Sequence, residues 1–361
     1  MELEQNMTRV YVGEDVLSLA RSRISVVFDN FKNVIVSVSG GKDSTTLYWL
    51  AVQEAQKRGR TVNAFFLDQE AEFQSSIDLM EQMMAHPVVK PLWYQVPLQM
   101  TNATSYEHPI LDSWAEGAEW MRPKHFLAIH HIEEDYPKRF YRFFYWLESR
   151  MRDTAFLIGL RTEESLNRLR AVMQNPGWNS VLWSTRTRGQ GTYRFYPIYD
   201  WSQSDVWKFI SDNNLPYNRI YDKMLMAKKD SYKTMRVSNL IHEKSFRCLS
   251  DLQEYEPETF DKLVRRVPGV HVASVYAREE GVFDGNKLPR AFKTWLDYRN
   301  HLLETSPIMH KDKFTSMFDK QPKEEEMYRR QVRQLLLNDH ENNLGIKPVR
   351  KKSIPDWWDI L

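Results

Sequence analysis

The stretch Val34–Leu47 constrains this chain more than any other part of its sequence. Its first residues form a run typical of a buried strand, with β-branched side chains at Val34, Ile35, Val36 and Val38. Gly40 and Gly41 interrupt the run, and apolar residues at helical spacing follow from Leu47 onward. A strand that turns through glycines into a helix creates an anion site, because the backbone can approach a ligand and unpaired N–H groups face it. Lys42 adds a positive charge to this predicted site.

Two common phosphate loops do not fit this stretch. The Walker A pattern needs a glycine where Val36 stands and a hydroxyl residue where Asp43 stands. The dinucleotide fingerprint needs a glycine spacing that Gly40-Gly41 does not provide. The remaining motif, Ser-Gly-Gly-Lys-Asp-Ser at 39–44, resembles the pyrophosphate loop of the ATP pyrophosphatases, the adenine-nucleotide alpha-hydrolase superfamily. Its predicted hydroxyl donors are Ser39, Ser44 and Thr45.

Composition narrows the class of protein. The length of 361 residues predicts more than one domain, and the 50 basic and 48 acidic residues nearly balance, which argues against wholesale coating of nucleic acid. The single cysteine, Cys248, excludes an intrachain disulfide and leaves too few thiolates for an iron–sulfur cluster. No signal peptide and no apolar run of about 18 residues is present, so we expect a soluble, cytoplasmic protein without membrane contact.

Strands and helices are predicted to alternate through the first 160 residues. The predicted strands are 34–38, 61–67, 92–96 and 154–160, and the predicted helices are 13–28, 43–57, 72–84 and 138–152. This order predicts an α/β fold, a Rossmann-like doubly wound parallel sheet, followed by a mainly helical C-terminal extension. Asp68 follows the second strand, so we expect it either to bind a ribose or metal at the sheet's carboxyl edge or to cap the next helix.

A second chemical stretch follows the strand at 154–160. Gly159-Leu160-Arg161 places a guanidinium beside the first loop, and the planar donor fork of arginine suits phosphate. Arg168 lies two helical turns further on and could face the same pocket. The alternative is a surface pair between arginine and the neighbouring Glu163 or Glu164. A metal site at His130-His131 is disfavoured, because adjacent side chains point apart on a helix.

Three separated elements together resemble one family. They are Ser39–Thr45, then Gly159–Arg168, then Pro197 with Asp200-Trp201, Asp205-Val206-Trp207 and Leu215-Pro216-Tyr217-Asn218. In this order and spacing they resemble the phosphoadenosine phosphosulfate reductase-like family over residues 30–222. The last third, with Met235–Lys244, resembles a bacterial subgroup related to immunoglobulin-binding regulator A. We therefore expect an N-terminal helix packed on the core at 1–30, a nucleotide domain at 31–222 and a helical domain at 223–361.

The resemblance implies ATP or a related adenine nucleotide with Mg²⁺. It implies that the loop cradles phosphates, that Asp43 helps hold Mg²⁺, that Asp68 lies near the adenosine, and that Arg161 and Arg168 bind the phosphate or sulfate end. The implied catalytic residues are Lys42, Asp43 and Arg161. The implied nucleotide-binding residues are Ser39, Gly40, Gly41, Lys42, Asp43, Ser44, Thr45, Asp68, Gly159, Arg161 and Arg168. Members usually cleave ATP between the alpha and beta phosphates by adenylating a substrate.

One difference from the family's sequence pattern affects which reaction is expected. The true reductases carry a nucleophilic cysteine in a Glu-Cys-Gly-hydrophobic-His segment, whereas Cys248 lies in Phe246-Arg247-Cys248-Leu249-Ser250. Reduction of a sulfonucleotide is thus disfavoured against adenylation. A third hypothesis is a nucleotide-dependent regulator or nucleic-acid-binding subunit that acts with a protein partner. This hypothesis is supported by the basic residues between Lys223 and Arg247 and by the tail with Lys347–Lys352 and Trp357-Trp358.

Overall fold

The structure, a computed structural model, describes most of the chain. The described residues are 13–105, 107–173, 177–226, 235, 237, 239–241, 248–276, 288–306, 308, 310–340 and 342. The basic residues Lys228, Lys229, Lys233, Arg236, Lys244 and Arg247 and the tail beyond 342 lie outside them. The chain forms two compact units, each described by itself. Unit 1 comprises Met1–Val96 and Pro123–Val237, and unit 2 comprises Pro97–Arg122 and Ser238–Leu361.

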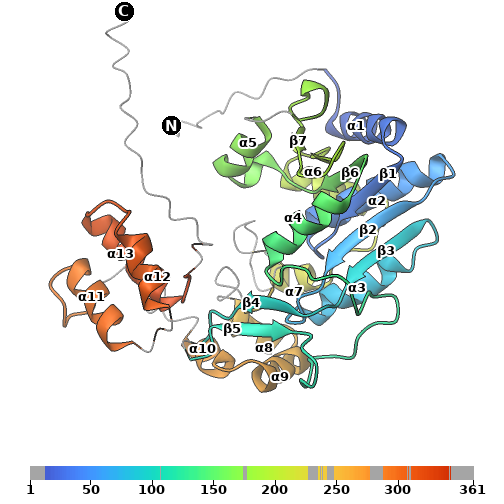
Figure 1. Cartoon of the computed structure of the whole chain (residues 1–361). Coiled ribbons are helices and arrows are strands. Elements are labelled where there is room, and N and C mark those ends of the chain that lie inside the picture. Colours follow the sequence, from blue (N-terminus) through green and yellow to red (C-terminus); the bar gives the residue numbers. More distant parts are fainter. Residues whose placement is uncertain are drawn as a thin grey trace, which may run out of the picture. The chain divides into compact units, whose positions relative to one another are not determined.

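Unit 1 is built on one mainly parallel sheet. Within the described residues the sheet has six strands in the order β3-β2-β1-β6-β8-β7, and only the β7–β8 pair is antiparallel (Figure 1). The strands are β1 (Asn33–Ser37), β2 (Val62–Leu67), β3 (Val89–Tyr94), β6 (Thr154–Ile158), β7 (Ser184–Arg186) and β8 (Tyr193–Phe195). The α/β class and the doubly wound parallel sheet predicted from sequence are confirmed.

Helices cover both faces of this sheet. They are α1 (Val16–Asn30), α2 (Lys42–Lys57), α3 (Gln74–Met84), α4 (Phe140–Arg150), α5 (Leu166–Met173), α6 (Gln203–Asp212) and α7 (Ile220–Met226). Successive strand side chains point to opposite faces. In β2, Ala64 and Phe66 therefore join the core formed with α1, α2, α3 and α6. Phe65 points to the other face, where its ring lies 5.5 Å from Phe144 of α4.

The order of the strands creates a switch point between β1 and β6. The chain leaves β1 for β2 and β3 on one side and returns to β6 on the other side. Ser37 pairs with Ile158, so the loops after the two strands begin at the same level. Ligands of open α/β sheets bind at such a point, beyond the carboxyl ends of the strands. The loop at 39–44 and the Gly159–Arg161 stretch therefore meet where the fold favours a site.

Two local expectations are corrected here. Helix α3 begins at Gln74 with Phe73 at its N-cap position, so Asp68 does not cap it. The third strand is Val89–Tyr94 rather than 92–96, since β3 pairs with β2 from Val89 onward.

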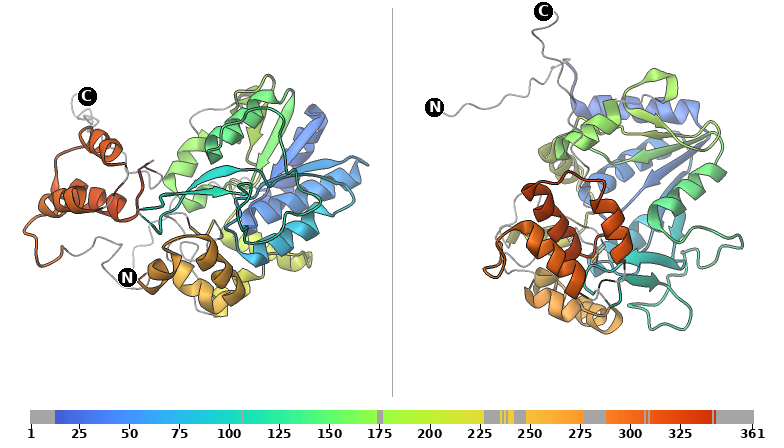
Figure 2. Two further views of the ribbon diagram at one scale, coloured as in Figure 1. Left: turned by 60° about the horizontal axis from the view of Figure 1, so that its bottom comes forward. Right: turned by 60° about the vertical axis from the view of Figure 1, so that its left-hand side comes forward.

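Unit 2 joins two parts of the chain that are far apart in sequence. Strands β4 (Leu98–Thr101) and β5 (Ile110–Ser113) form an antiparallel hairpin. It lies beside the helices α8 (Leu249–Tyr255), α9 (Pro257–Arg266) and α10 (Val270–Tyr276) (Figures 1 and 2). Ala103 N donates to Ile241 O, and Arg266 Nη2 donates to Asp112 O. The other described helices of this unit are α11 (Trp295–Thr305), α12 (Lys311–Phe318) and α13 (Glu325–Leu336).

The helical C-terminal extension is thus confirmed. Pro257 begins α9 at its first position, directly after α8 and its C-cap residue Glu256. Residues 97–122 supply the hairpin of this unit. In the part of the chain that the structure describes, no helix is both long and apolar enough to cross a lipid bilayer.

A substitution at Gly159 tests how closely the residue after β6 packs against the start of α2. A Cβ atom there would stand 2.9 Å from the backbone C and O atoms of Asp43, and backbone cannot yield easily. We expect Gly159→Ala to lower the free energy of unfolding by about 2 kcal/mol, measured by urea denaturation. The matched control is Gly41→Ala, whose Cβ would meet nothing closer than 3.5 Å. Equal stability of the two variants would contradict the packing described.

Candidate functional site

The loop between β1 and α2 has the geometry of an anion site. Gly40 has a φ of +72°, which only glycine adopts easily, and its Cα lies against Ser76 of α3. Gly41 is the N-cap of α2 and contributes no side chain to the helix end. Among the described residues, the N–H groups of Gly41, Asp43 and Ser44 donate to no acceptor. The start of α2 therefore presents unpaired donors and the positive end of the helix dipole.

The three hydroxyl residues predicted to bind phosphate have different surroundings. Ser44 Oγ closes the loop on itself, since it accepts from Ser39 N at 3.2 Å and donates to Gly41 O at 3.0 Å. Ser39 is exposed, and its Oγ lies 3.1 Å from Ser44 Oγ. Thr45 is fully buried, and its Oγ1 has no hydrogen-bond partner in the described part of the chain. Ser39 thus faces solvent, whereas Ser44 shapes the loop.

Two residues outside the predicted site hold this loop from the other side. Asn218 Nδ2 donates to Gly40 O at 3.1 Å and to Ser76 Oγ at 2.8 Å. Tyr221 Oη accepts from Lys42 N at 3.0 Å. Both residues are almost fully buried, with exposed fractions of 1% and 3%. Both lie nearly 180 residues beyond the loop. Asn218 ends the third motif of the family resemblance, whereas no pattern in the sequence signals the position of Tyr221.

Charged side chains surround the start of α2. Arg161, which follows β6, donates from Nε to Asp43 Oδ1 at 2.7 Å. Lys42 Nζ lies 3.3 Å from the other carboxylate oxygen of Asp43. The sequence-based prediction that Arg161 lies beside the first loop is therefore confirmed by the fold. The guanidinium is fully buried, however, and contacts carboxylates on several sides.

Two glutamates and a second arginine complete this charge cluster. Arg161 Nη1 donates to Glu163 Oε2 at 2.7 Å, and its Nη2 lies 3.5 Å from Glu164 Oε1. Arg168 of α5 pairs with the other oxygen of Glu164 and is 42% exposed. Burial, together with a hydrogen bond to Asp43, raises the pKa of Glu164 above its ordinary value. The cluster balances three cations, Lys42, Arg161 and Arg168, against three carboxylates, Asp43, Glu163 and Glu164.

Asp68 lies at the end of β2 in a closed environment. Its carboxylate is fully buried and accepts hydrogen bonds from Glu70 N at 2.9 Å, Trp93 Nε1 at 3.1 Å and Gln95 Nε2 at 2.9 Å. A nucleotide that contacts Asp68 would have to replace one of these donors. The ligand role of Asp68 remains a prediction, and the structure adds a role in joining β2 to β3.

The third motif of the family resemblance anchors α1. Arg23 of that helix donates from both Nη atoms to the carboxylate of Asp200, at 2.8 and 2.7 Å. Trp201 Nε1 donates to Val16 O at 3.0 Å.

The histidine pair at 130–131 does not form a metal site with its described neighbours. His130 Nε2 is hydrogen-bonded to the carbonyl oxygen of His125. Across the described residues, no group of three His, Cys, Asp or Glu side chains is arranged to hold a metal ion.

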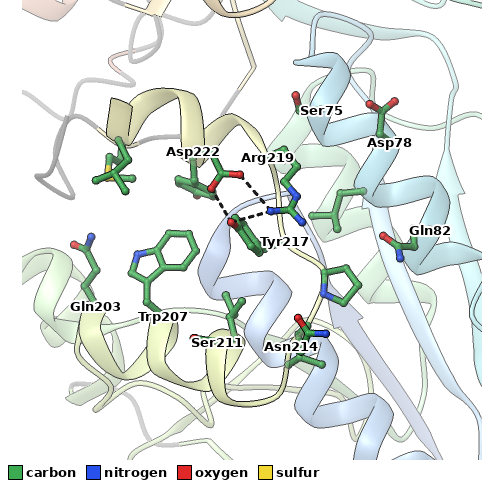
Figure 3. A pocket seen from close by; sticks show the side chains of 17 residues that line it. Ser75, Asp78, Gln82, Gln203, Trp207, Ser211, Asn214, Tyr217, Arg219 and Asp222 are labelled. Atoms are coloured by element: carbon green, nitrogen blue, oxygen red, sulfur yellow. Dashed lines mark hydrogen bonds and ion pairs between the residues drawn. The ribbon is translucent and has the colours of Figure 1, made fainter. Parts of the chain in front are cut away.

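A cavity of about 940 Å³ lies among α3, α6 and α7 (Figure 3), and Tyr221, whose Oη contacts Lys42 N, is among its described lining residues. Its described lining includes Trp207, Tyr217, Arg219 and Asp222, and none of the residues of the phosphate loop. Tyr217 Oη and Arg219 Nη1 both bond to the carboxylate of Asp222, at 2.6 and 3.3 Å. Arg219, the one cation among the described lining residues, is thus paired with Asp222.

The two arginines of the charge cluster give a matched test. Arg161→Met leaves Asp43 and two glutamates without their buried partner, and we expect the free energy of unfolding to fall by about 3 kcal/mol. Arg168→Met removes a half-exposed partner of Glu164 and should cost below about 1 kcal/mol. Chemical denaturation of both variants measures the difference. Equal losses would show that Arg161 does not hold the cluster together.

Comparisons with known proteins agree with the family resemblance of the sequence. Residues 33–235 match the model of the phosphoadenosine phosphosulfate reductase domain, and residues 231–355 match a domain of unknown function, DUF3440. The uncharacterized protein YbdN of Escherichia coli strain K12 is 26% identical over 309 residues, which are 81% of this chain and 76% of that protein.

Solved structures with a related fold include two nucleotide enzymes. A phosphoadenylyl-sulfate reductase from Candida auris, in a phosphate complex, is 16% identical with a TM-score of 0.33 over 60% of this chain and 93% of that one. An FMN adenylyltransferase from Candida glabrata, in complex with FMN and the ATP analogue AMPCPP, is 12% identical with a TM-score of 0.37 over 64% and 68%. Because the reductase-domain model spans more than half of the sequence, this chain belongs to the phosphoadenosine phosphosulfate reductase domain family.

Proposed function

We propose that this protein binds ATP at the start of α2 and transfers AMP to an acceptor, with release of pyrophosphate. The observation that carries the proposal is the meeting of unpaired α2 donors with the Asp43–Arg161 pair at the switch point of the sheet. A phosphate group placed at a helix start receives both N–H donors and the helix dipole. The exposed Ser39 and half-buried Gly41 leave this position open to a ligand.

The proposed reaction needs positioning more than a covalent nucleophile. An acceptor oxygen or nitrogen attacks the alpha phosphorus, the bond to the bridging oxygen of the beta phosphate breaks, and pyrophosphate leaves with that electron pair. The N–H groups of Gly41, Asp43 and Ser44 would stabilise the negative charge on the leaving group. Lys42, Asp43 and Arg161 are the proposed catalytic residues. Of these, Arg161 would act by holding Asp43 in place, because its guanidinium is buried among carboxylates.

The donor set at the site also fits Mg²⁺. This ion usually takes one or two protein carboxylates together with the phosphates of its nucleotide. Asp43 and Glu164 supply hard oxygen ligands at one place, where burial of Glu164 first, and then its hydrogen bond to Asp43, raises the pKa of Glu164. Bound there, Mg²⁺ would neutralise phosphate charge. The cluster itself carries no net positive charge, so we expect ATP affinity to depend on the ion.

Reduction of a sulfonucleotide is the less favoured function. It needs a nucleophilic thiol, and the only cysteine, Cys248, belongs to unit 2, half-buried at the start of α8. The segment around it lacks the glycine and histidine that the reductase family places after its cysteine. A nucleotide-dependent regulator or nucleic-acid-binding subunit that acts with a protein partner is the remaining alternative, because the reductase cysteine motif is missing and the last third of the sequence is basic and aromatic.

Product analysis separates these functions. With ATP and Mg²⁺, we expect the wild-type protein to release pyrophosphate together with AMP or an adenylated acceptor, resolved by ³¹P NMR and anion-exchange chromatography. Lys42→Ala should weaken ATP binding by about tenfold, because it removes a charge-assisted contact, and should slow release accordingly. Tight ATP binding without turnover would indicate the regulator, and sulfite release from a sulfonucleotide and a thiol reductant would indicate the reductase. Absence of any nucleotide binding would contradict all three.

Gly41→Ala tests the position of the phosphate directly. The backbone φ of −79° suits alanine, and the methyl group would have ordinary contacts, so the fold should be unchanged. The methyl group would fill the space in which the loop is proposed to receive a phosphate oxygen. We expect ATP affinity to fall by about tenfold, measured by calorimetry at unchanged melting temperature. Unaltered affinity would place the phosphates elsewhere.

A further inference from the structure

Tyr221 is the side chain that contacts the start of α2 most directly. Its Oη accepts the N–H of Lys42, the first residue of the helix, at 3.0 Å. Its ring is 3% exposed and packs at right angles to Trp207, with centroids 5.2 Å apart. The Lys42 ammonium lies 5.9 Å from the centre of the same ring. The hydroxyl is therefore held at one fixed position beside the loop.

The hydroxyl of Tyr221 also carries a proton that it can donate. Among the residues that the structure describes, Tyr221 Oη has Lys42 N as its hydrogen-bond partner and no acceptor for its own proton. Burial raises the pKa of Tyr221, so the group stays protonated at physiological pH and acts as a donor rather than a base. A hydroxyl that already accepts a hydrogen bond is a stronger donor, because the two bonds polarise each other.

The free space beside Gly41 shows where that proton can go. A Cβ atom at Gly41 would stand 3.7 Å from Tyr221 Oη and 3.5 Å from Ser39 Oγ. Two hydroxyls thus border one small space, which the glycine leaves open next to the unpaired N–H groups of α2. All cations of the charge cluster are paired with carboxylates, so neutral donors have a larger share in binding an anion here.

We propose that Tyr221 is a phosphate-binding residue, which relays the Lys42 N–H through its own hydroxyl to an oxygen of the bound nucleotide's phosphates. The inference rests on the proposed nucleotide site at the start of α2 and adds a donor from α7, which no part of the loop motif contains. Tyr221 would hold its donor in place before the ligand arrives, since the ring is packed and the hydroxyl anchored. Preorganised donors of this kind lower the reorganisation needed on binding.

Tyr221→Phe tests the proposal against Tyr217→Phe. Both substitutions remove one tyrosine hydroxyl at or just before the start of α7, and both tyrosines line the cavity of Figure 3. Tyr217 Oη, however, donates to Asp222, whereas Tyr221 Oη contacts Lys42 N. Calorimetry with Mg²⁺-ATP and with inorganic pyrophosphate is the measurement. We expect Tyr221→Phe to weaken both ligands by about fivefold and Tyr217→Phe to leave both unchanged. The loss with pyrophosphate shows that the contact is to phosphate, because that ligand has no base or ribose.

The possible results distinguish a failure of the proposed role of Tyr221 from a failure of the proposed nucleotide site. Wild-type affinity in Tyr221→Phe, or equal losses in both variants, would overturn the role of the hydroxyl while leaving the nucleotide site intact. Tighter binding by Tyr221→Phe would also overturn it, since the hydroxyl would then be competing with phosphate for the Lys42 N–H. Failure of the wild-type protein to bind either ligand would overturn the proposed function, and this inference with it.

Discussion

The ion pair between Asp43 and Arg161 is the interaction on which the rest of the site depends. It joins the first turn of α2 to the end of β6, the two places that flank the switch point of the sheet. The pair can form only because Gly159 lets β6 approach the Asp43 backbone without a side chain between them. Arg161 then reaches on to Glu163, which accepts from Gln203 N at the start of α6. One buried guanidinium thus fixes three segments around the loop.

Local patterns predicted the central part of this arrangement well. The β-branched run, the two glycines and the following helix are consecutive, and their geometry depends on neighbours along the chain. The alternation of strands and helices then fixes a parallel sheet, and a parallel sheet brings its carboxyl ends to one edge. Arg161 could therefore be placed beside Lys42 and Asp43 from sequence alone, although more than a hundred residues separate them.

The partners of those residues could not be predicted, because they depend on packing between distant segments. Asn218 belongs to a motif of the family resemblance, but that motif does not reveal its hydrogen bond to Gly40 O, and Tyr221 lies outside the motif. The sequence likewise suggested that Arg161 was available to phosphate, whereas three carboxylates surround it. Asp68 was expected to be open at the sheet edge and is instead enclosed by donors from β3 and the residue after it. The sequence therefore predicted which charged residues lie at the site, but only the folded structure shows which of them pair with one another.

The hairpin of β4 and β5 has a consequence for how the chain acquires its structure during synthesis. Ile241, which receives a hydrogen bond from Ala103, leaves the ribosome roughly 130 residues after the hairpin, on the order of ten seconds later. A two-stranded hairpin is only marginally stable by itself in water. Unit 2 therefore cannot consolidate until the helices after 248 have been made. While the parallel sheet of unit 1 is still being synthesised, the hairpin has no partner from the C-terminal part of the chain. Its strand edges can then pair with other chains.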